Sequence, residues 1–285
     1  MLLAIPALRA LGAGGPVTLA AQSHIATLLQ ALGVVDDQVA FDALGLDALF
    51  GEDGARAPRL PAAARVVSWF GARDPVFRRR LASLVRDLVI APSVEAGRPV
   101  WEHLLATIGA PAGEWCAPIE VLAPMRALGV AARVAAGGHG PPPWLVVHPG
   151  AGSPAKRWPA EAFARVVTTL AARARLNVCV HVGPADAEAA AALRNHLGEG
   201  VAWLTEPTLE ALAGVLADAA LFVGNDSGVS HLAAALGVPS LVLFDPRHLD
   251  WRPWWSGAGI RTVTLSATLP AEVDAVIVEL ERKVR

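Results

Sequence analysis

Apolar runs and amphipathic stretches alternate along the second half of the chain. Runs with the length and composition of buried β-strands cover residues 144–147, 177–182, 221–223 and 240–244. Stretches in which apolar residues recur at helical spacing cover residues 159–174, 185–197, 209–217, 230–236 and 270–284. This repeated order of strand and helix predicts a doubly wound parallel sheet, and therefore the α/β class.

The last amphipathic stretch has the clearest apolar face. Its stripe consists of Val273, Val276, Ile277, Leu280 and Val284, and most of its charged residues lie off that stripe. Such a stripe needs an apolar partner, and we expect that partner at a junction between two domains.

The first half repeats the pattern less clearly, with strand candidates at residues 17–21, 64–69 and 87–91. A chain of 285 residues exceeds what one hydrophobic core usually serves. The run of glycines and prolines at 137–143 has the composition of a linker. We therefore expect two Rossmann-like domains, at residues 1–136 and 144–285, that face a central cleft.

Composition excludes several classes of protein. Hydrophobic residues make up 54% of the chain and charged residues 18%, which is typical of a folded globular protein. The formal charge is −2 and the basic residues are scattered along the sequence, so we expect neither a nucleic-acid partner nor a basic amphipathic membrane anchor. The two cysteines, Cys116 and Cys179, lie far apart and encode neither a disulfide framework nor a metal site.

No segment has the pattern of a secretory leader or of a membrane span. Residues 1–21 are apolar, but they lack a basic start and are interrupted by Pro6, Arg9 and three glycines. Residues 227–244 are free of acidic and basic side chains apart from His231, but a Gly-Val-Pro break divides them. We expect a cytoplasmic protein without a transmembrane segment.

Candidate chemistry begins where the strand at 221–223 ends, in the segment Gly-Asn-Asp-Ser-Gly at 224–228. Ligands of open α/β sheets bind beyond the carboxyl ends of strands, and the free N–H groups of a helix start attract anions. We expect Gly224 and Gly228 to let a ligand approach the backbone. For Asp226 the alternative is a helix cap, and for His231 it is a packed helix residue.

A second glycine-bearing loop follows the strand at 144–147. Gly150 and Gly152 are expected to expose backbone amides, while Ser153 adds a hydroxyl donor and Lys156 a mobile positive charge. We expect this loop at a neighbouring strand end of the same sheet, so that both loops neutralise a diphosphate. The spacing fits neither the dinucleotide-binding GxGxxG pattern nor a P-loop.

Lys156 and Arg157 could simply be two solvated charges without a ligand. Positive charge is unfavourable at a helix start, however, so their position there favours a bound anion. Glu188 could present its carboxylate to a ribose hydroxyl, but acids are ordinary at helix starts. The aromatic and basic segment at 244–255 either covers the ligand or braces the C-terminal helix.

Two segments carry a family resemblance: HPGAGSPAKRWP at 148–159 and GNDSGVSHLAAALGVPSLVLFDP at 224–246. Both resemble signature blocks of glycosyltransferase family 9, the lipopolysaccharide heptosyltransferases. The resemblance implies a GT-B fold whose C-terminal domain holds ADP-heptose or a related nucleotide sugar and whose N-terminal domain holds the acceptor. It also implies inverting transfer without a metal or cofactor.

The resemblance also implies roles for individual residues. Ser153 and Lys156 would contact the phosphates, and Lys156 would stabilise the leaving group. The nucleotide pocket would be lined by Asp226, Ser227, Gly228 and His231, with Glu188 as a weaker ribose candidate.

The start of the chain departs from the family pattern. Residues 2–11 resemble the family's first helix, whereas the strand and the Gly-Asp loop that precede this helix in the family would lie before Met1. The aspartate of that loop is thought to be the general base on the acceptor hydroxyl, a role worth roughly 10²- to 10⁴-fold in rate. We therefore expect either a longer natural chain or weak activity.

These expectations give one main function and two alternatives. The main one is transfer of a heptose or related sugar from a nucleotide diphosphate to a lipopolysaccharide-core or similar glycan acceptor. A lipid-linked acceptor would be reached by peripheral contact at the inner face of the inner membrane. The alternatives are a nucleotide-sugar-binding protein without turnover and a GT-B-like nucleotide-sugar epimerase.

Overall fold

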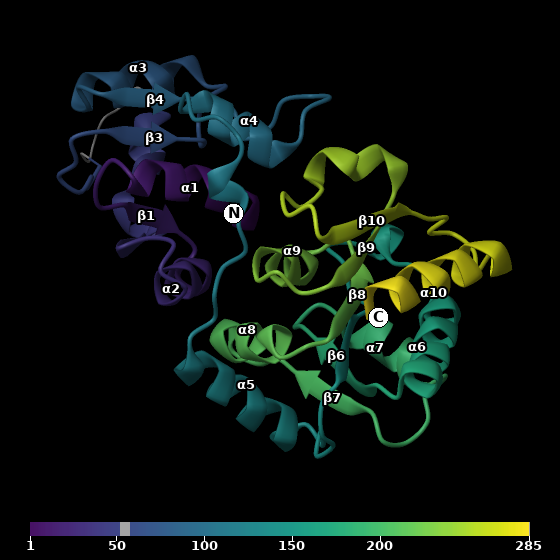
Figure 1. Cartoon of the computed structure of the whole chain (residues 1–285). Coiled ribbons are helices and arrows are strands. Elements are labelled where there is room, and N and C mark those ends of the chain that lie inside the picture. Colours follow the sequence, from purple (N-terminus) through teal and green to yellow (C-terminus); the bar gives the residue numbers. More distant parts are fainter. Residues whose placement is uncertain (52–57, 285) are drawn as a thin grey trace. The chain divides into compact units, whose positions relative to one another are not determined.

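The computed structural model describes residues 1–51 and 58–284, and the chain divides into two compact units. Unit 1 contains Met1 and Leu3–Cys116, and unit 2 contains Leu2 and Ala117–Arg285. Figure 1 shows the helices and strands of both units.

Unit 2 is built on one sheet of six parallel strands in the order β10-β9-β8-β5-β6-β7. Its strands are β5 (Trp144–His148), β6 (Asn177–Val182), β7 (Ala202–Thr205), β8 (Leu221–Asn225), β9 (Ser240–Phe244) and β10 (Ala258–Thr262). The four central strands match the predicted apolar runs. The two edge strands, β7 and β10, are partly exposed and were not predicted.

Helices cover both faces of this sheet, as the doubly wound pattern requires (Figure 1). One layer contains α5 (Ala123–Ala135), α8 (Leu209–Ala217) and α9 (Gly228–Ala235). The other contains α6 (Ala160–Ala174), α7 (Ala187–Arg194) and α10 (Pro270–Val284). The short 3-10 helices are η5 (Pro154–Lys156) and η6 (Pro246–Trp251).

The apolar stripe of α10 packs inside unit 2. Val273, Val276 and Leu280 are fully buried in the same core as β5, β6 and α6. The helix contacts α6 and β9. The expectation that this stripe meets a domain junction was therefore wrong, because the stripe completes the core of its own unit.

Close packing between α5 and α8 sets the boundary between the units. A Cβ atom on Gly129 of α5 would lie 2.2 Å from the backbone carbon of Gly214 on α8, so the two helices approach without side chains between them. Arg126 of α5 also donates to the carboxylate of Asp218 at 2.8 Å. The division therefore falls before α5, between Cys116 and Ala117, and not at the glycine- and proline-rich segment 137–143.

In the part of unit 1 that the structure describes, the strands form two separate parallel pairs, β1-β2 and β3-β4. The strands are β1 (Thr18–Ala21), β2 (Asp37–Ala40), β3 (Val66–Ser68) and β4 (Leu88–Ile90). The helices are α1 (Ile5–Gly12), α2 (Ser23–Ala31), α3 (Pro75–Leu84) and α4 (Val100–Thr107), with 3-10 helices η1 (Leu2–Ala4), η2 (Phe41–Leu44), η3 (Leu46–Leu49) and η4 (Glu114–Cys116). β2 was not predicted, since its residues are polar or only half-buried.

Among the residues that the structure describes, no helix is both long enough and apolar enough to cross a bilayer.

Candidate functional site

The strand order of unit 2 creates a switch point between β5 and β8. The chain runs outward from β5 to β6 and β7, and then returns to the other side of β5 with β8, β9 and β10. His148 is paired with Gly224, so the two strands end side by side. This confirms that the two glycine-bearing loops lie at neighbouring strand ends of one sheet, where open α/β folds bind ligands.

Side chains from the two loops meet at Asp226. Lys156 Nζ, from the first loop, donates to Asp226 Oδ2 at 3.0 Å. His231 Nε2, one turn into α9, lies 3.5 Å from Asp226 Oδ1. Asp226 and His231 are almost fully buried, whereas the side chain of Lys156 keeps 30% of its surface exposed. The ammonium group is thus held in place and remains open to a ligand.

The charge of Asp226 is stabilised by these two neighbours. Burial alone would raise the pKa of the carboxyl group, but hydrogen bonds with His231 and Lys156 more than offset that effect, so the pKa of Asp226 lies below its ordinary value. Asp226 is therefore ionised at neutral pH and aligns both partners. It does not cap α9, which was the alternative interpretation.

The N-cap of α9 is Ser227. Its hydroxyl accepts from the N–H of Ser230 at 3.2 Å, and the Ser230 hydroxyl donates to the carbonyl of Asn225 at 2.5 Å. Within the described part of the chain, the N–H groups of Gly228 and Val229 have no protein acceptor. These two donors lie in the first turn of α9, at the end of the helix that attracts anions.

The four glycines of the two loops have different functions. Cβ atoms on Gly152 and Gly228 would meet nothing within 4 Å, so these backbones are open to a ligand. A Cβ on Gly150 would overlap the Asp186 carboxylate, and one on Gly224 would lie 2.8 Å from the Phe222 ring. The expectation that Gly224 lets a ligand approach the backbone was wrong, because protein atoms occupy that space. At Gly150 protein atoms likewise fill the place of a side chain, and the exposure of its backbone amide stays a prediction.

Asn225 is the residue of this site that sequence reasoning missed. It is fully buried, and its Nδ2 donates to the carbonyl of Pro149 at 2.8 Å. Its Oδ1 accepts from the N–H of Trp158 at 3.0 Å. One side chain at the end of β8 therefore holds both ends of the loop after β5. A polar residue that ends an otherwise apolar strand was the signal for this function.

The remaining predicted residues lie around this centre. Ser153 is half-buried in extended backbone and starts η5, where its carbonyl accepts from the N–H of Lys156 at 3.1 Å. Glu188 is 83% exposed and pairs with Arg157 at 2.9 Å. Arg157 also donates to the carbonyl of Ala185 at 3.2 Å. Arg157 is therefore paired with an exposed acid and is itself mostly covered, whereas Lys156, paired with the buried Asp226, keeps 30% of its side-chain surface exposed.

A buried cluster beneath the first loop contains His148, His181 and Asp186. It is the only group of three or more metal-ligating residue types that meet closely in the described ranges. The two Nδ1 atoms of the histidines lie 3.1 Å apart, and an oxygen of Asp186 accepts from the N–H of Gly183 at 2.9 Å. The two histidines contact each other and the Gly183 N–H holds Asp186, so we assign the cluster to the support of the loop.

The two buried histidines predict a pH-dependent stability. Burial lowers the pKa of His148 to about 4 and that of His181 to about 3, from the ordinary 6.5. The folded protein holds both neutral, while the unfolded chain takes up protons below pH 6.5. Stability is therefore complete above pH 6.5 and falls as the pH drops toward 4, by roughly 2–4 kcal/mol at pH 5.

Denaturant unfolding between pH 5 and pH 7.5 measures this slope. His181→Leu is expected to reduce the slope, because one of the two titrating groups is removed. The exposed His196 provides the matched control, and His196→Leu is expected to keep the slope of the wild type. Equal slopes in all three proteins would contradict the assignment.

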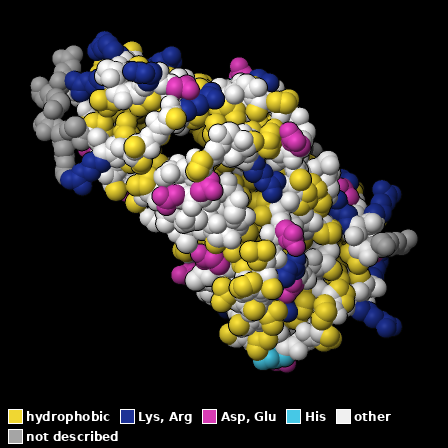
Figure 2. Space-filling view, turned by 60° about the vertical axis from the view of Figure 1, so that its left-hand side comes forward, with side chains coloured by type: hydrophobic (Ala, Val, Ile, Leu, Met, Phe, Trp, Pro, Cys, Tyr) yellow, Lys and Arg dark blue, Asp and Glu magenta, His cyan; other side chains and the backbone are white. Residues whose placement is uncertain are grey.

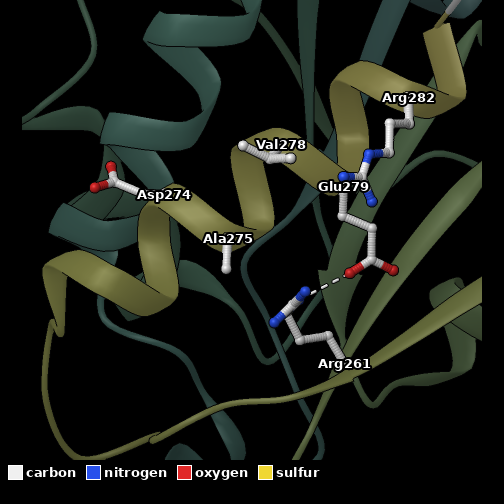
Figure 3. A pocket seen from close by; sticks show the side chains of 6 residues that line it. All are labelled: Arg261, Asp274, Ala275, Val278, Glu279 and Arg282. Atoms are coloured by element: carbon white, nitrogen blue, oxygen red, sulfur yellow. Dashed lines mark hydrogen bonds and ion pairs between the residues drawn. The ribbon is translucent and has the colours of Figure 1, made fainter.

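A hollow of unit 2, of about 520 Å³, lies between α10 and β10. Arg261 points across it to Glu279, and the two side chains are joined at 2.8 Å (Figure 3). None of its lining residues comes from the two loops. In the aromatic and basic segment at 244–255, Arg247 pairs with Asp245 at 2.6 Å, so its charge is not free for a ligand.

The sequence and the fold both have known relatives. The family model described as "Glycosyltransferase family 9 (heptosyltransferase)" matches residues 110–273, more than half of the chain. Lipopolysaccharide heptosyltransferase 3 of Escherichia coli is 32% identical over 121 residues, which are 39% of this chain and 34% of that protein. The chain thus matches about a third of the length of this curated relative.

Two solved structures share the fold. The E. coli ADP-heptose lipopolysaccharide heptosyltransferase II has a TM-score of 0.73 at 19% identity, covering 99% of this chain and 93% of its own. The E. coli heptosyltransferase WaaC with ADP has a TM-score of 0.67 at 18% identity, covering 99% and 95%. These likenesses confirm the expected GT-B-like α/β fold, and with the family match they show that the chain belongs to glycosyltransferase family 9, the heptosyltransferases.

Proposed function

We propose that the chain binds a nucleotide-diphosphate sugar at the ends of β5 and β8 and transfers its sugar to a glycan acceptor. The family match and the names of its relatives favour a heptose or related sugar and an acceptor of the lipopolysaccharide core. We place this reaction at the inner face of the inner membrane, where a lipid-linked acceptor and a soluble donor meet.

The observation that carries the proposal is the meeting of the two loops at Lys156 and Asp226. The partly exposed ammonium of Lys156 is paired with Asp226, two residues before Gly228, whose backbone is open and whose N–H group has no acceptor in the described part of the chain. A diphosphate has the charge and the acceptor oxygens that suit these donors. His231 and Ser227 then lie next to the nucleotide, and Ser153 next to the phosphates.

The chemistry follows from this arrangement. The acceptor hydroxyl oxygen attacks the anomeric carbon from the side opposite the diphosphate, the bond from that carbon to the diphosphate oxygen breaks, and the hydroxyl proton passes to a general base. Negative charge develops on the departing diphosphate, where fixed positive groups stabilise the transition state most. Lys156 and the start of α9 supply this stabilisation, so we propose inverting transfer without a metal or cofactor.

A two-part experiment tests the proposal. Calorimetric titration with ADP and with ADP-heptose is expected to show binding of both, whether or not the chain turns over. Incubation with ADP-heptose and a lipopolysaccharide-core acceptor is then expected to release ADP and to add the mass of one sugar to the acceptor. Absence of ADP binding would refute the site. Binding without product would indicate a nucleotide-sugar-binding protein, and a free altered sugar would indicate an epimerase.

A further inference from the structure

Unit 1 contains a cationic hollow whose lining includes no residue of the proposed donor site. It has a volume of about 570 Å³ and is lined by α3 and by the segment that leads into β4. Its eight lining residues are Pro75, Arg78, Arg79, Ala82, Val85, Arg86, Leu88 and Ile90. Three are arginines, five are apolar and none is acidic.

Helical geometry brings two of these arginines together. Pro75, Arg78, Arg79 and Ala82 lie on one side of α3, because positions three or four residues apart share a helix face. Arg86 follows in the bend between α3 and β4, after the helix has ended at Leu84. The opposite side carries Phe77 and Leu81, which are buried in the core of unit 1. Burial of that apolar side turns the arginines outward.

The surrounding sequence has a strong local excess of positive charge. Residues 58–98 contain eight arginines and three acidic residues, a surplus of five positive charges in a chain whose net charge is −2. The three acids are used elsewhere: Asp74 caps α3 by accepting from the N–H of Phe77 at 2.8 Å, Asp87 lies 3.8 Å from Arg65, and Glu95 lies 3.5 Å from Arg98. Among the residues that the structure describes, no acidic side chain lines the hollow.

The apolar neighbours of the arginines make this surface amphipathic. Val85, Leu88 and Ile90 form the floor of the hollow, and Leu84 at the end of α3 is 53% exposed. Figure 2 shows dark blue arginine side chains among yellow hydrophobic ones over this part of unit 1. The expectation of scattered basic residues without a basic surface was therefore wrong for α3, because the fold brings together charges that look dispersed.

We propose that this arginine surface, made of Arg78, Arg79 and Arg86 with Leu84, binds the phosphate headgroups of an anionic lipid bilayer. Guanidinium groups pair with phosphate oxygens through two parallel hydrogen bonds. Basic and apolar side chains together are what a protein needs to rest on an anionic leaflet. This inference rests on the proposed function in one respect, because a lipid-linked acceptor requires the enzyme to work at the membrane surface.

Cosedimentation of the full chain with vesicles tests the proposal. Binding is expected with equal parts of phosphatidylglycerol and phosphatidylcholine, to disappear with phosphatidylcholine alone, and to fall as salt is added. Each arginine near an anionic surface contributes about fivefold to partitioning, so Arg79→Ala/Arg86→Ala is expected to lower the partition coefficient about 25-fold. Arg78 is left intact because it also donates to the carbonyl of Ala72 at 3.2 Å.

Two further variants act as controls. Arg79→Lys/Arg86→Lys keeps both charges and is expected to retain most of the binding. Arg165→Ala/Arg173→Ala removes two exposed charges from α6 of unit 2 and is expected to bind like the wild type. Thermal unfolding of each variant shows whether it is folded, and the salt and lipid dependence of the wild type is informative without any substitution.

The outcomes separate this surface from other ligands and from the donor site. Equal binding to neutral and anionic vesicles, or an unchanged partition coefficient in Arg79→Ala/Arg86→Ala, would overturn the proposal. So would calorimetric binding of inorganic phosphate, or of a duplex oligonucleotide, at this surface without vesicle binding. Vesicle binding that fails while ADP binding persists leaves the proposed donor site intact, and the reverse result leaves the arginine surface intact.

Discussion

Replacing Lys156 with methionine is expected to reduce kcat/KM for sugar transfer by roughly 10²- to 10³-fold, the usual effect of losing one fixed group that stabilises developing charge. The substitution keeps an unbranched side chain of similar length and removes its charge and its hydrogen-bond donors. The affinity for ADP falls as well, because the free nucleotide carries the same diphosphate. Steady-state kinetics measure the first effect and calorimetric titration with ADP the second.

The neighbouring cation supplies the control. Arg157 is one residue away, but it already pairs with Glu188 and donates to the carbonyl of Ala185, so Arg157→Met is expected to change kcat/KM only a few-fold. Lys156→Met leaves Asp226 with one partner, His231, and thermal unfolding monitors that cost. Unchanged ADP affinity in a folded Lys156→Met protein would remove Lys156 from the site.

The sequence was sufficient to predict the sheet of unit 2, because its central strands are continuous apolar runs and its helices have clear apolar stripes. The edge strands β7 and β10 were not predicted from the sequence, because a partly exposed strand needs fewer apolar residues than a central one. In unit 1 the short strands are only half-buried, and β2 contains Asp37 and Gln38. Apolar periodicity is weak where there is little core to form.

The candidate site was predicted as two loops, but not as a network. The two loops were expected at neighbouring strand ends, and the pairing of β5 with β8 confirms this, but which side chains meet there depends on three-dimensional packing. For the same reason Asp226 was open to two interpretations until Lys156, 70 residues away in the chain, was found to lie 3.0 Å from it. The glycines illustrate the same limit, since a packing glycine such as Gly150 and an open one such as Gly152 look alike in sequence.

Domain boundaries depend on contacts between helices more than on local composition. The segment 137–143 has the composition of a linker, yet the side chain of Asn177 donates to the carbonyl of Pro141 at 2.5 Å, and the preceding α5 lies directly on α8. Two small residues, Gly129 and Gly214, permit that contact. The sequence showed both glycines but not that they face each other.

Replacing Asn225 with leucine is expected to lower the free energy of unfolding by about 2–5 kcal/mol. The leucine has a similar volume, but it leaves the carbonyl of Pro149 and the N–H of Trp158 buried without partners, at about 1–3 kcal/mol each. Because these two groups hold the loop that carries Ser153 and Lys156, ADP affinity is expected to fall in the fraction that still folds. Denaturant unfolding and calorimetry measure the two effects.

Asn177→Leu is the matched control for this prediction, because Asn177 begins strand β6 and its partner, the carbonyl of Pro141, is exposed to solvent. Water replaces the lost hydrogen bond there, so the cost is expected to stay below about 1 kcal/mol. Equal losses in the two variants would show that Asn225 is an ordinary polar residue. A large loss of ADP affinity in Asn225→Leu alone would show that this one buried amide fixes the loop after β5, which carries Ser153 and Lys156, against the end of β8.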